Sequence, residues 1–224
     1  MQSREKESVK KSASLLVLLL MVSVVLVSLP QIGVVKAQST IYIRSDGSIE
    51  GTDKIQRDGD VYTFTDNVSN GPIFVEKDSI VIDGAGYILQ GGDGRGIVLS
   101  GRNSVTVKNV RLEIEGGYGI YLVGASNCTV YGNEISGGDF PYNIELSGSF
   151  NNTIEGNIIT NAFRGILIYG SDDNIITGNI VTDCVVGIEL HDSLNKCAQK
   201  QPDERQQPQL FCSRLPNLQL CQRC

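Results

Sequence analysis

The chain has 224 residues, a formal net charge of −6, no tryptophan and an aromatic content of 6%. This length allows one domain of modest size. The negative charge, without a lysine or arginine cluster in the central region, argues against nucleic acid as a partner, and the low aromatic content argues against long rows of aromatic binding platforms.

Residues 1–37 have the pattern of an export signal. Four basic residues precede an apolar run over residues 13–29, and Val35 and Ala37 supply small side chains at positions −3 and −1 of a cleavage site. The run is also close to the minimum length of a membrane span. We expect a cleaved signal peptide, with an uncleaved N-terminal anchor as the alternative. Either way the remainder is exported, to the extracellular space or the cell surface, and only an uncleaved segment touches a membrane.

Residues 38–79 lead into a repetitive region. A polar, glycine- and aspartate-rich stretch over residues 45–60 is expected to be a loop. Ile73 lies 24 residues before Ile97, which predicts that a partial rung begins here. We predict an N-terminal cap and a partial rung, with strands at residues 41–43, 61–65 and 73–75.

Residues 80–194 repeat with a period of 22 to 25 residues, and repeats of this length indicate one structural unit stacked on itself. The apolar residues alternate with period 2, as in strands, and glycine, asparagine, aspartate and serine separate them, as in turns. No segment shows a sustained helical period. The main marker reads Val130, Asn133, Ile135; Ile154, Asn157, Ile159; Ile176, Asn179, Val181; looser copies read Ile82, Ala85, Tyr87 and Val107, Val110, Leu112.

This pattern predicts an all-β protein, a single-stranded parallel β-helix of about five to six rungs, where one rung is one turn of the coil. Equivalent strands then pair in parallel and in register, roughly 4.8 Å apart. One rung cannot offset the conformational entropy that its folding costs, so each rung depends on its neighbours.

The segment from Asn151 to Ile159 resembles the right-handed parallel β-helix repeats of the pectate-lyase-like superfamily, in particular the NosD-type and carbohydrate-binding repeat proteins of prokaryotic cell surfaces. The resemblance covers residues 61–190 and implies a right-handed coil. It is specific for the fold and not for the chemistry.

Asn133, Asn157 and Asn179 occupy one position in successive rungs. Stacked identical amides can form a hydrogen-bonded ladder. A binding surface is the alternative interpretation, but we expect a structural ladder because an unpaired buried amide costs about 1–3 kcal/mol.

Residues 195–224 break the pattern, since this stretch has no glycine and holds four of the six cysteines. We expect an irregular tail with two open interpretations. It is either a genuine C-terminal cap or tail, or the product of a reading-frame slip or a truncated gene that interrupts a longer β-helix.

The outward residues beside the Gly-Ile strands form a mixed column of Val98, Tyr121, Glu145, Leu167 and Glu189. A solvated face with scattered charge explains most of this column. The alternative is a sugar-binding groove around Tyr121, Glu145 and Glu189. Nothing in the chain matches the catalytic motif of a lyase, so no catalytic residue is assigned.

Metal sites find little support in the sequence, and no cofactor is expected. The resemblance to NosD implies copper, which prefers methionine, cysteine or histidine. Met1 and Met21 lie in the leader and His191 is the only histidine. The Cys221–Cys224 pair lacks the second pair or the histidine that a zinc site needs.

Three Asn-x-Ser/Thr motifs, at Asn67, Asn127 and Asn151, allow glycosylation where the host has the machinery, although such motifs also arise by chance in turns. The first hypothesis for function is a non-catalytic structural or binding module, with polysaccharide or the cell envelope as its partner. The alternatives are a lyase- or epimerase-like carbohydrate-active enzyme, or a fragment of one, and a NosD-type accessory protein of a copper enzyme.

Overall fold

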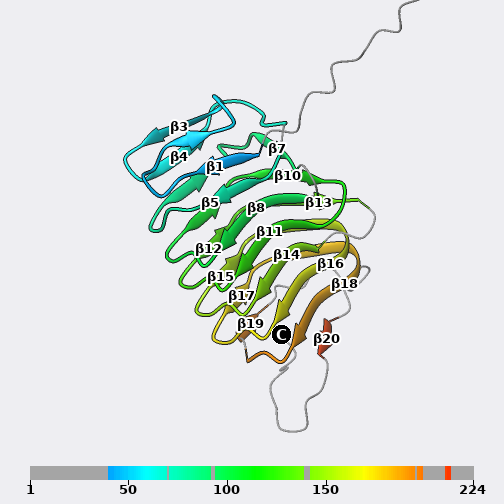
Figure 1. Ribbon diagram of the computed structural model, residues 1–224. Helices are drawn as coiled ribbons and strands as arrows, with labels where there is room; N and C mark the ends of the chain where they lie inside the picture. Colours follow the sequence, from blue (N-terminus) through cyan, green and yellow to red (C-terminus); the bar gives the residue numbers. More distant parts are fainter. Residues whose placement is uncertain are drawn as a thin grey trace, which may run out of the picture. The chain divides into compact units, whose positions relative to one another are not determined.

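The computed structural model describes residues 40–69, 71–91, 94–138, 142–194, 196–198 and 210–212. Within these ranges every regular element is a β-strand, and the chain winds into a solenoid of about five turns (Figure 1). No helix in the described ranges is long and apolar enough to cross a membrane. The predicted export signal over residues 1–37 lies outside the described residues.

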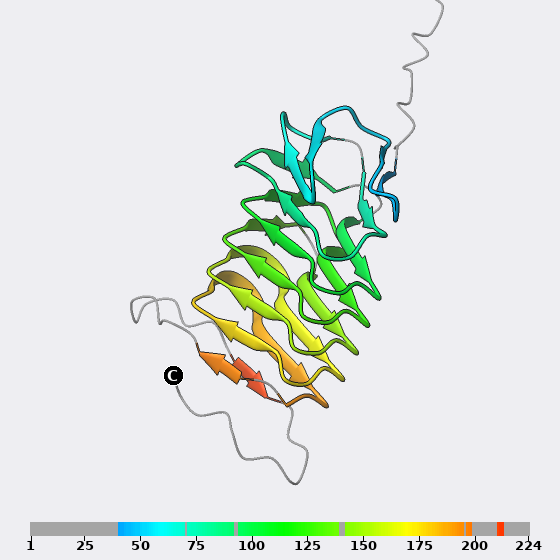
Figure 2. The same ribbon diagram turned by 90° about the vertical axis from the view of Figure 1, so that its left-hand side faces the viewer.

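The strands form three parallel stacks, and Figure 2 shows their stacking from a second side. Two long strands, β16 (Ile158–Tyr169) and β18 (Ile180–His191), each belong to two stacks, because their first halves pair in one and their second halves in the next. The first stack begins with β7 (Ile88–Gln90), β10 (Arg111–Ile114) and β13 (Glu134–Gly137).

The second stack carries the face described in the next subsection. It leads through β1 (Ile41–Ile43), β5 (Ile73–Val75), β8 (Arg95–Ser100), β11 (Tyr118–Val123) and β14 (Tyr142–Ser147) to the second halves of β16 and β18. The third stack consists of β4 (Val61–Phe64), β6 (Val81–Asp83), β9 (Thr106–Lys108), β12 (Thr129–Tyr131), β15 (Thr153–Glu155) and β17 (Ile175–Thr177).

The register confirms that equivalent residues of successive rungs lie on top of one another. Val130 pairs with Ile154, and Ile154 pairs with Ile176. All three side chains are completely buried. Isoleucine, valine and leucine side chains from every rung form one continuous core between the three stacks. Their burial provides the favourable free energy of folding that no single rung could supply. The handedness of the coil stays a prediction.

The N-terminal segment differs from the predicted loop over residues 45–60. β2 (Ile49–Glu50) and β3 (Ile55–Asp58) lie in this segment and pair antiparallel with β1 and β4. These two hairpins lie at the N-terminal end of the second and third stacks. The prediction missed both strands because they are short and mostly polar, so only Ile55 of the pair is buried. Ile73 pairs in parallel with Ile97, which lies 24 residues later in the chain.

One predicted alignment is wrong by two residues. The pattern placed Tyr87 in the inward column with Leu112, but Leu112 pairs with Leu89, and Tyr87 is 37% exposed. The preceding turn contains Ala85 and Gly86, both with positive φ. A turn with two left-handed residues delays the return of the chain to the core, and the alternation in the sequence does not show this delay.

Two short strands fall within the stretch predicted to be an irregular tail. β19 (Lys196–Ala198) pairs in parallel with β17, and β20 (Leu210–Cys212) pairs in parallel with β18. The backbone ladder therefore continues into this stretch. The rest of the predicted tail lies outside the described residues.

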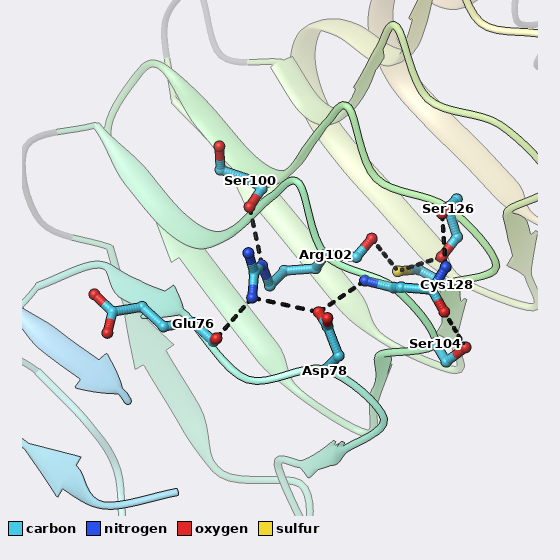
Figure 3. A network of polar contacts seen from close by, with 8 residues as sticks. Glu76, Asp78, Ser100, Arg102, Ser104, Ser126 and Cys128 are labelled. Carbon is cyan, nitrogen blue, oxygen red and sulfur yellow. Dashed lines mark hydrogen bonds and ion pairs between the residues drawn. The ribbon is translucent and has the colours of Figure 1, made fainter. Parts of the chain in front are cut away.

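A charged residue connects two successive rungs at one corner of the solenoid. The Arg102 side chain donates hydrogen bonds to the carbonyls of Ser100 and Glu76, at 3.0 and 2.6 Å, and forms an ion pair with Asp78 at 3.3 Å (Figure 3). Asp78 also accepts a hydrogen bond from the backbone N–H of Asn103 at 3.0 Å. The guanidinium thus holds the turn after β8 against the turn after β5.

Candidate ligand-binding face

The second stack presents an outward row of side chains in strict register, which we call the central row. Parallel pairing places the predicted neighbours Tyr121 and Glu145 side by side on successive rungs. Glu189 lies two rungs beyond Glu145, with Leu167 between them. At about 4.8 Å per rung, Glu145 and Glu189 are about 10 Å apart along the stack. The row contains Val98, Tyr121, Glu145, Leu167 and Glu189, and it continues through Phe74 and Tyr42 at its N-terminal end.

A second row flanks the central row, and its residues were not among the predicted site residues. Tyr118 and Tyr142 pair with each other here and belong to the same rungs as Tyr121 and Glu145. The available signal was their 24-residue spacing, with each tyrosine directly before the position that glycine occupies in most rungs. The complete flanking row is Arg95, Tyr118, Tyr142, Arg164 and Val186.

Three tyrosine rings gather where these rows meet. The rings of Tyr118 and Tyr121 stack with centroids 4.7 Å apart and an interplanar angle of 15°, and the Tyr142 ring lies tilted against Tyr118 at 5.5 Å. All three side chains are partly exposed. The protein is poor in aromatic residues as a whole, but the register concentrates three of its eight tyrosines in one place.

Glu145 lies in the same rung as Tyr142 and next to Tyr121, yet it is only 8% exposed. Its Oε2 has no hydrogen-bond partner among the described residues. Burial raises the pKa of this carboxyl group, and the positive charge of Arg164 offsets only part of the effect. Burial and the charge of Glu145 in turn raise the pKa of Tyr118 and Tyr121. The charge of Glu145 therefore acts on both phenol groups.

Glu189 has the opposite environment. Its carboxylate forms an ion pair with Arg164 and also lies 2.6 Å from Nε2 of His191. Burial alone would raise the pKa of Glu189, but the hydrogen bonds from Arg164 and His191 outweigh it, so the pKa is lowered. The Nη1 of Arg164 also donates to the Tyr142 hydroxyl at 3.0 Å. Arg164 therefore links the charged end of the face to the tyrosines.

The asparagine column lies inside the solenoid and not on this face. Nδ2 of Asn133 donates to Oδ1 of Asn157 at 2.9 Å, and Nδ2 of Asn157 donates to Oδ1 of Asn179 at 2.9 Å. All three side chains are at most 1% exposed. They satisfy one another and the backbone, as a structural ladder does, and a ligand at the surface cannot reach them.

Two further columns of buried polar side chains lie inside the solenoid and were not predicted from the sequence. Nδ2 of Asn152 donates to Oδ1 of Asn174 at 3.0 Å. Ser149 and Ser171 form a second column, in which the backbone N–H of Ser149 donates to Oγ of Ser171 at 2.9 Å. Both pairs repeat at a spacing of 22 residues, which was the signal available in the sequence.

The three possible glycosylation sites are exposed. Asn127 and Asn151 take the same turn position in adjacent rungs, with φ of 55° and 56°. Asparagine tolerates this left-handed conformation better than most residues. The turn conformation therefore explains why asparagine occurs at these positions, whether or not a glycan is attached. The Oδ1 of Asn67 accepts a hydrogen bond from the backbone N–H of Ile88 at 2.9 Å. Glycosylation stays a prediction at all three sites.

The stacked parallel strands and the periodic inward columns define a β-helix repeat protein. The sequence model of the NosD family, described as "Periplasmic copper-binding protein (NosD)", matches residues 34–198, and the chain belongs to this family. No curated protein and no solved structure shows significant similarity to the chain.

The described residues do not fit the copper that the family description names. Within the described ranges no group of three or more histidine, cysteine, aspartate or glutamate side chains could hold a metal ion. Burial raises the pKa of both Cys128 and Cys184, which favours the thiol over the thiolate that binds metal. His191 lies against Glu189. The side chains of Cys197, Cys212, Cys221 and Cys224 lie outside the described residues.

Proposed function

We propose that this protein is an exported, non-catalytic β-helix module that binds polysaccharide of the cell envelope across the tyrosine-bearing face of the second stack. The proposal is carried by one observation, the cluster of Tyr118, Tyr121 and Tyr142 on the same two successive rungs as Glu145. Export rests on the N-terminal sequence pattern, and the periplasmic description of the family agrees with it.

The chemistry of the face suits a sugar chain. Partly exposed phenol rings offer flat apolar surface for the C–H face of a pyranose ring, and their hydroxyl groups, with the carboxyl group of Glu145, can bond to sugar hydroxyls. The tyrosines and Glu145 lie on successive rungs, so an extended polymer can contact more than one rung at once. A small ligand would use one rung only.

A second candidate is a copper-related accessory role, which the family match favours. Titration of the purified protein with Cu(I) and Cu(II) tests it. Tight, stoichiometric binding would favour this role over the polysaccharide proposal.

Affinity electrophoresis of the purified protein in gels containing soluble polysaccharides tests the main proposal. We expect retardation by at least one polymer and a loss of most of it in Tyr121→Ala. Tyr131→Ala is the matched control, because Tyr131 is 48% exposed on β12 of the third stack. Equal retardation of the two variants, or none in the wild type, would contradict the proposal. Unsaturated products in the same mixtures would favour a lyase.

A further inference from the structure

Two buried side-chain oxygens among the described residues lack a hydrogen-bond partner, and both belong to β14. Oδ1 of Asn143 is one and Oε2 of Glu145 is the other. The Asn143 side chain is occupied on its nitrogen, which donates to the carbonyls of Ile135 and Thr160. Glu145 belongs to the central row of the outward face, so its free oxygen, although shielded from solvent, lies on the side of the strand where a ligand would bind.

The neighbours of Glu145 compensate its charge only in part. Along the central row it lies between Tyr121 and Leu167. The nearby Arg164 already forms an ion pair with Glu189 and a hydrogen bond with Tyr142. Arg95, in the flanking row, lies two rungs away. A carboxylate buried in this way favours a hydrogen-bond donor that carries no negative charge.

A polyuronate chain laid across this face would bring its carboxylates next to Glu145. Two like charges repel strongly where little water separates them. The net charge of −6 of the whole chain adds to this repulsion at long range. A sugar hydroxyl meets no such penalty, since it donates to a carboxylate and also pairs with a carboxylic acid.

We infer that the face takes a hydroxyl-bearing polysaccharide without acidic groups and discriminates against polyuronates, with Glu145 as the residue whose carboxyl group determines this specificity. The inference rests on the proposed function. In this arrangement the tyrosine rings hold the sugar ring, and Glu145 accepts hydrogen bonds from its hydroxyl groups. The ring contacts supply affinity for any sugar polymer, and Glu145 lowers the affinity for polymers that carry negative charge.

Isothermal titration of the full chain with soluble glucomannan and polygalacturonate at pH 7 tests the inference. We expect glucomannan to bind at least about tenfold more tightly than polygalacturonate. Glu145→Gln keeps the shape and the hydrogen-bonding capacity but removes the charge. We expect it to bind glucomannan within about threefold of the wild type and to reduce the preference over polygalacturonate several-fold.

Two further variants complete the test. Glu145→Leu removes the hydrogen bonds and should weaken glucomannan binding about tenfold or more. Glu155→Gln makes the same chemical change as Glu145→Gln at an exposed position on β15 of the third stack, and should leave the preference unchanged. Circular dichroism of each variant verifies that it is folded.

The outcomes separate this inference from the proposed function. If polygalacturonate binds at least as tightly as glucomannan, or if Glu145→Gln leaves the preference unchanged, the inference is overturned while polysaccharide binding stands. If neither polymer binds the wild type, the proposed function fails and the inference fails with it.

Discussion

The side-chain oxygen of Asn179 accepts two hydrogen bonds from Asn157, one from the backbone N–H at 3.0 Å and one from Nδ2 at 2.9 Å. Nδ2 of Asn157 also donates to the carbonyl of Val130 at 3.0 Å. One buried amide therefore joins three successive rungs. Its two Nδ2 hydrogens and its oxygen are all used, which is why this position does not tolerate a change of charge or shape.

We predict that Asn157→Asp destabilises the protein by roughly 3–5 kcal/mol at pH 7, because it places an uncompensated charge in the core and removes both Nδ2 donors. Urea unfolding followed by circular dichroism measures the change. Asn151→Asp is the matched control, since Asn151 is exposed on a turn, and should stay within about 0.5 kcal/mol of the wild type. A similar small effect at both positions would show that the ladder does not stabilise the solenoid.

The two carboxyl groups of the central row should respond to pH in opposite ways. The folded-state pKa of Glu145 is raised above its ordinary value of 4.5, so this group stabilises the fold below pH 4.5 and loses that contribution as pH rises through the folded pKa. Glu145→Gln removes the cost of burying the charge. We expect its melting temperature to exceed that of the wild type at pH 7, and the difference to shrink towards pH 4.

Glu189 provides the comparison for Glu145. Its folded-state pKa is lowered, so its contribution is present above pH 4.5 and is lost as pH falls through the folded pKa. Glu189→Gln should therefore lower the melting temperature at pH 7 and have less effect in acid. Calorimetric melting of both variants from pH 4 to pH 7 measures these shifts. Parallel pH profiles for the two variants would contradict the assigned environments.

We expect the loss of the Arg102 side chain to destabilise the fold more than the loss of an ordinary surface ion pair does. Arg102→Met keeps much of the side-chain volume but removes the bonds to the carbonyls of Glu76 and Ser100 and to Asp78. We expect a loss of about 1–3 kcal/mol in urea unfolding.

The matched control for Arg102→Met is Arg111→Met. Arg111 pairs with Glu134 at 3.0 Å, and both side chains are more than half exposed. Exposed pairs of this kind contribute at most about 1 kcal/mol. If Arg111→Met costs as much as Arg102→Met, the corner contacts contribute nothing beyond a surface ion pair.

The fold was predictable from the sequence because each rung repeats the same short pattern of apolar and turn residues. Val130, Ile154 and Ile176 could be aligned by spacing alone, and the register agrees with that alignment. The alignment was wrong at Tyr87, where the turn conformation, and not the apolar pattern, sets the register. Alternation describes strands well but carries no information about how many residues a corner uses.

The candidate face was only partly predictable. Tyr121, Glu145 and Glu189 could be placed in one outward column, because outward positions alternate with inward ones. The pattern did not predict the burial of Glu145 or the pairing of Glu189 with Arg164, since both depend on the size and direction of neighbouring side chains. Tyr118 and Tyr142 were missed because they lie directly before the glycine position, where the alternation of inward and outward residues is interrupted.

Disulfide trapping tests the in-register stacking most directly. Ile158 and Ile180 are direct partners on successive rungs and are both exposed by more than 40%. Their Cα atoms, about 4.8 Å apart, satisfy the geometry of a disulfide, whereas Ile158 and Thr182 are offset by two residues and about 8 Å apart, too far to bridge. After mild oxidation and peptide mapping by mass spectrometry, we predict a cross-link in the Ile158→Cys/Ile180→Cys variant and none in Ile158→Cys/Thr182→Cys. A cross-link only in the offset pair, or in both pairs equally, would contradict the stacked register from which the face is built.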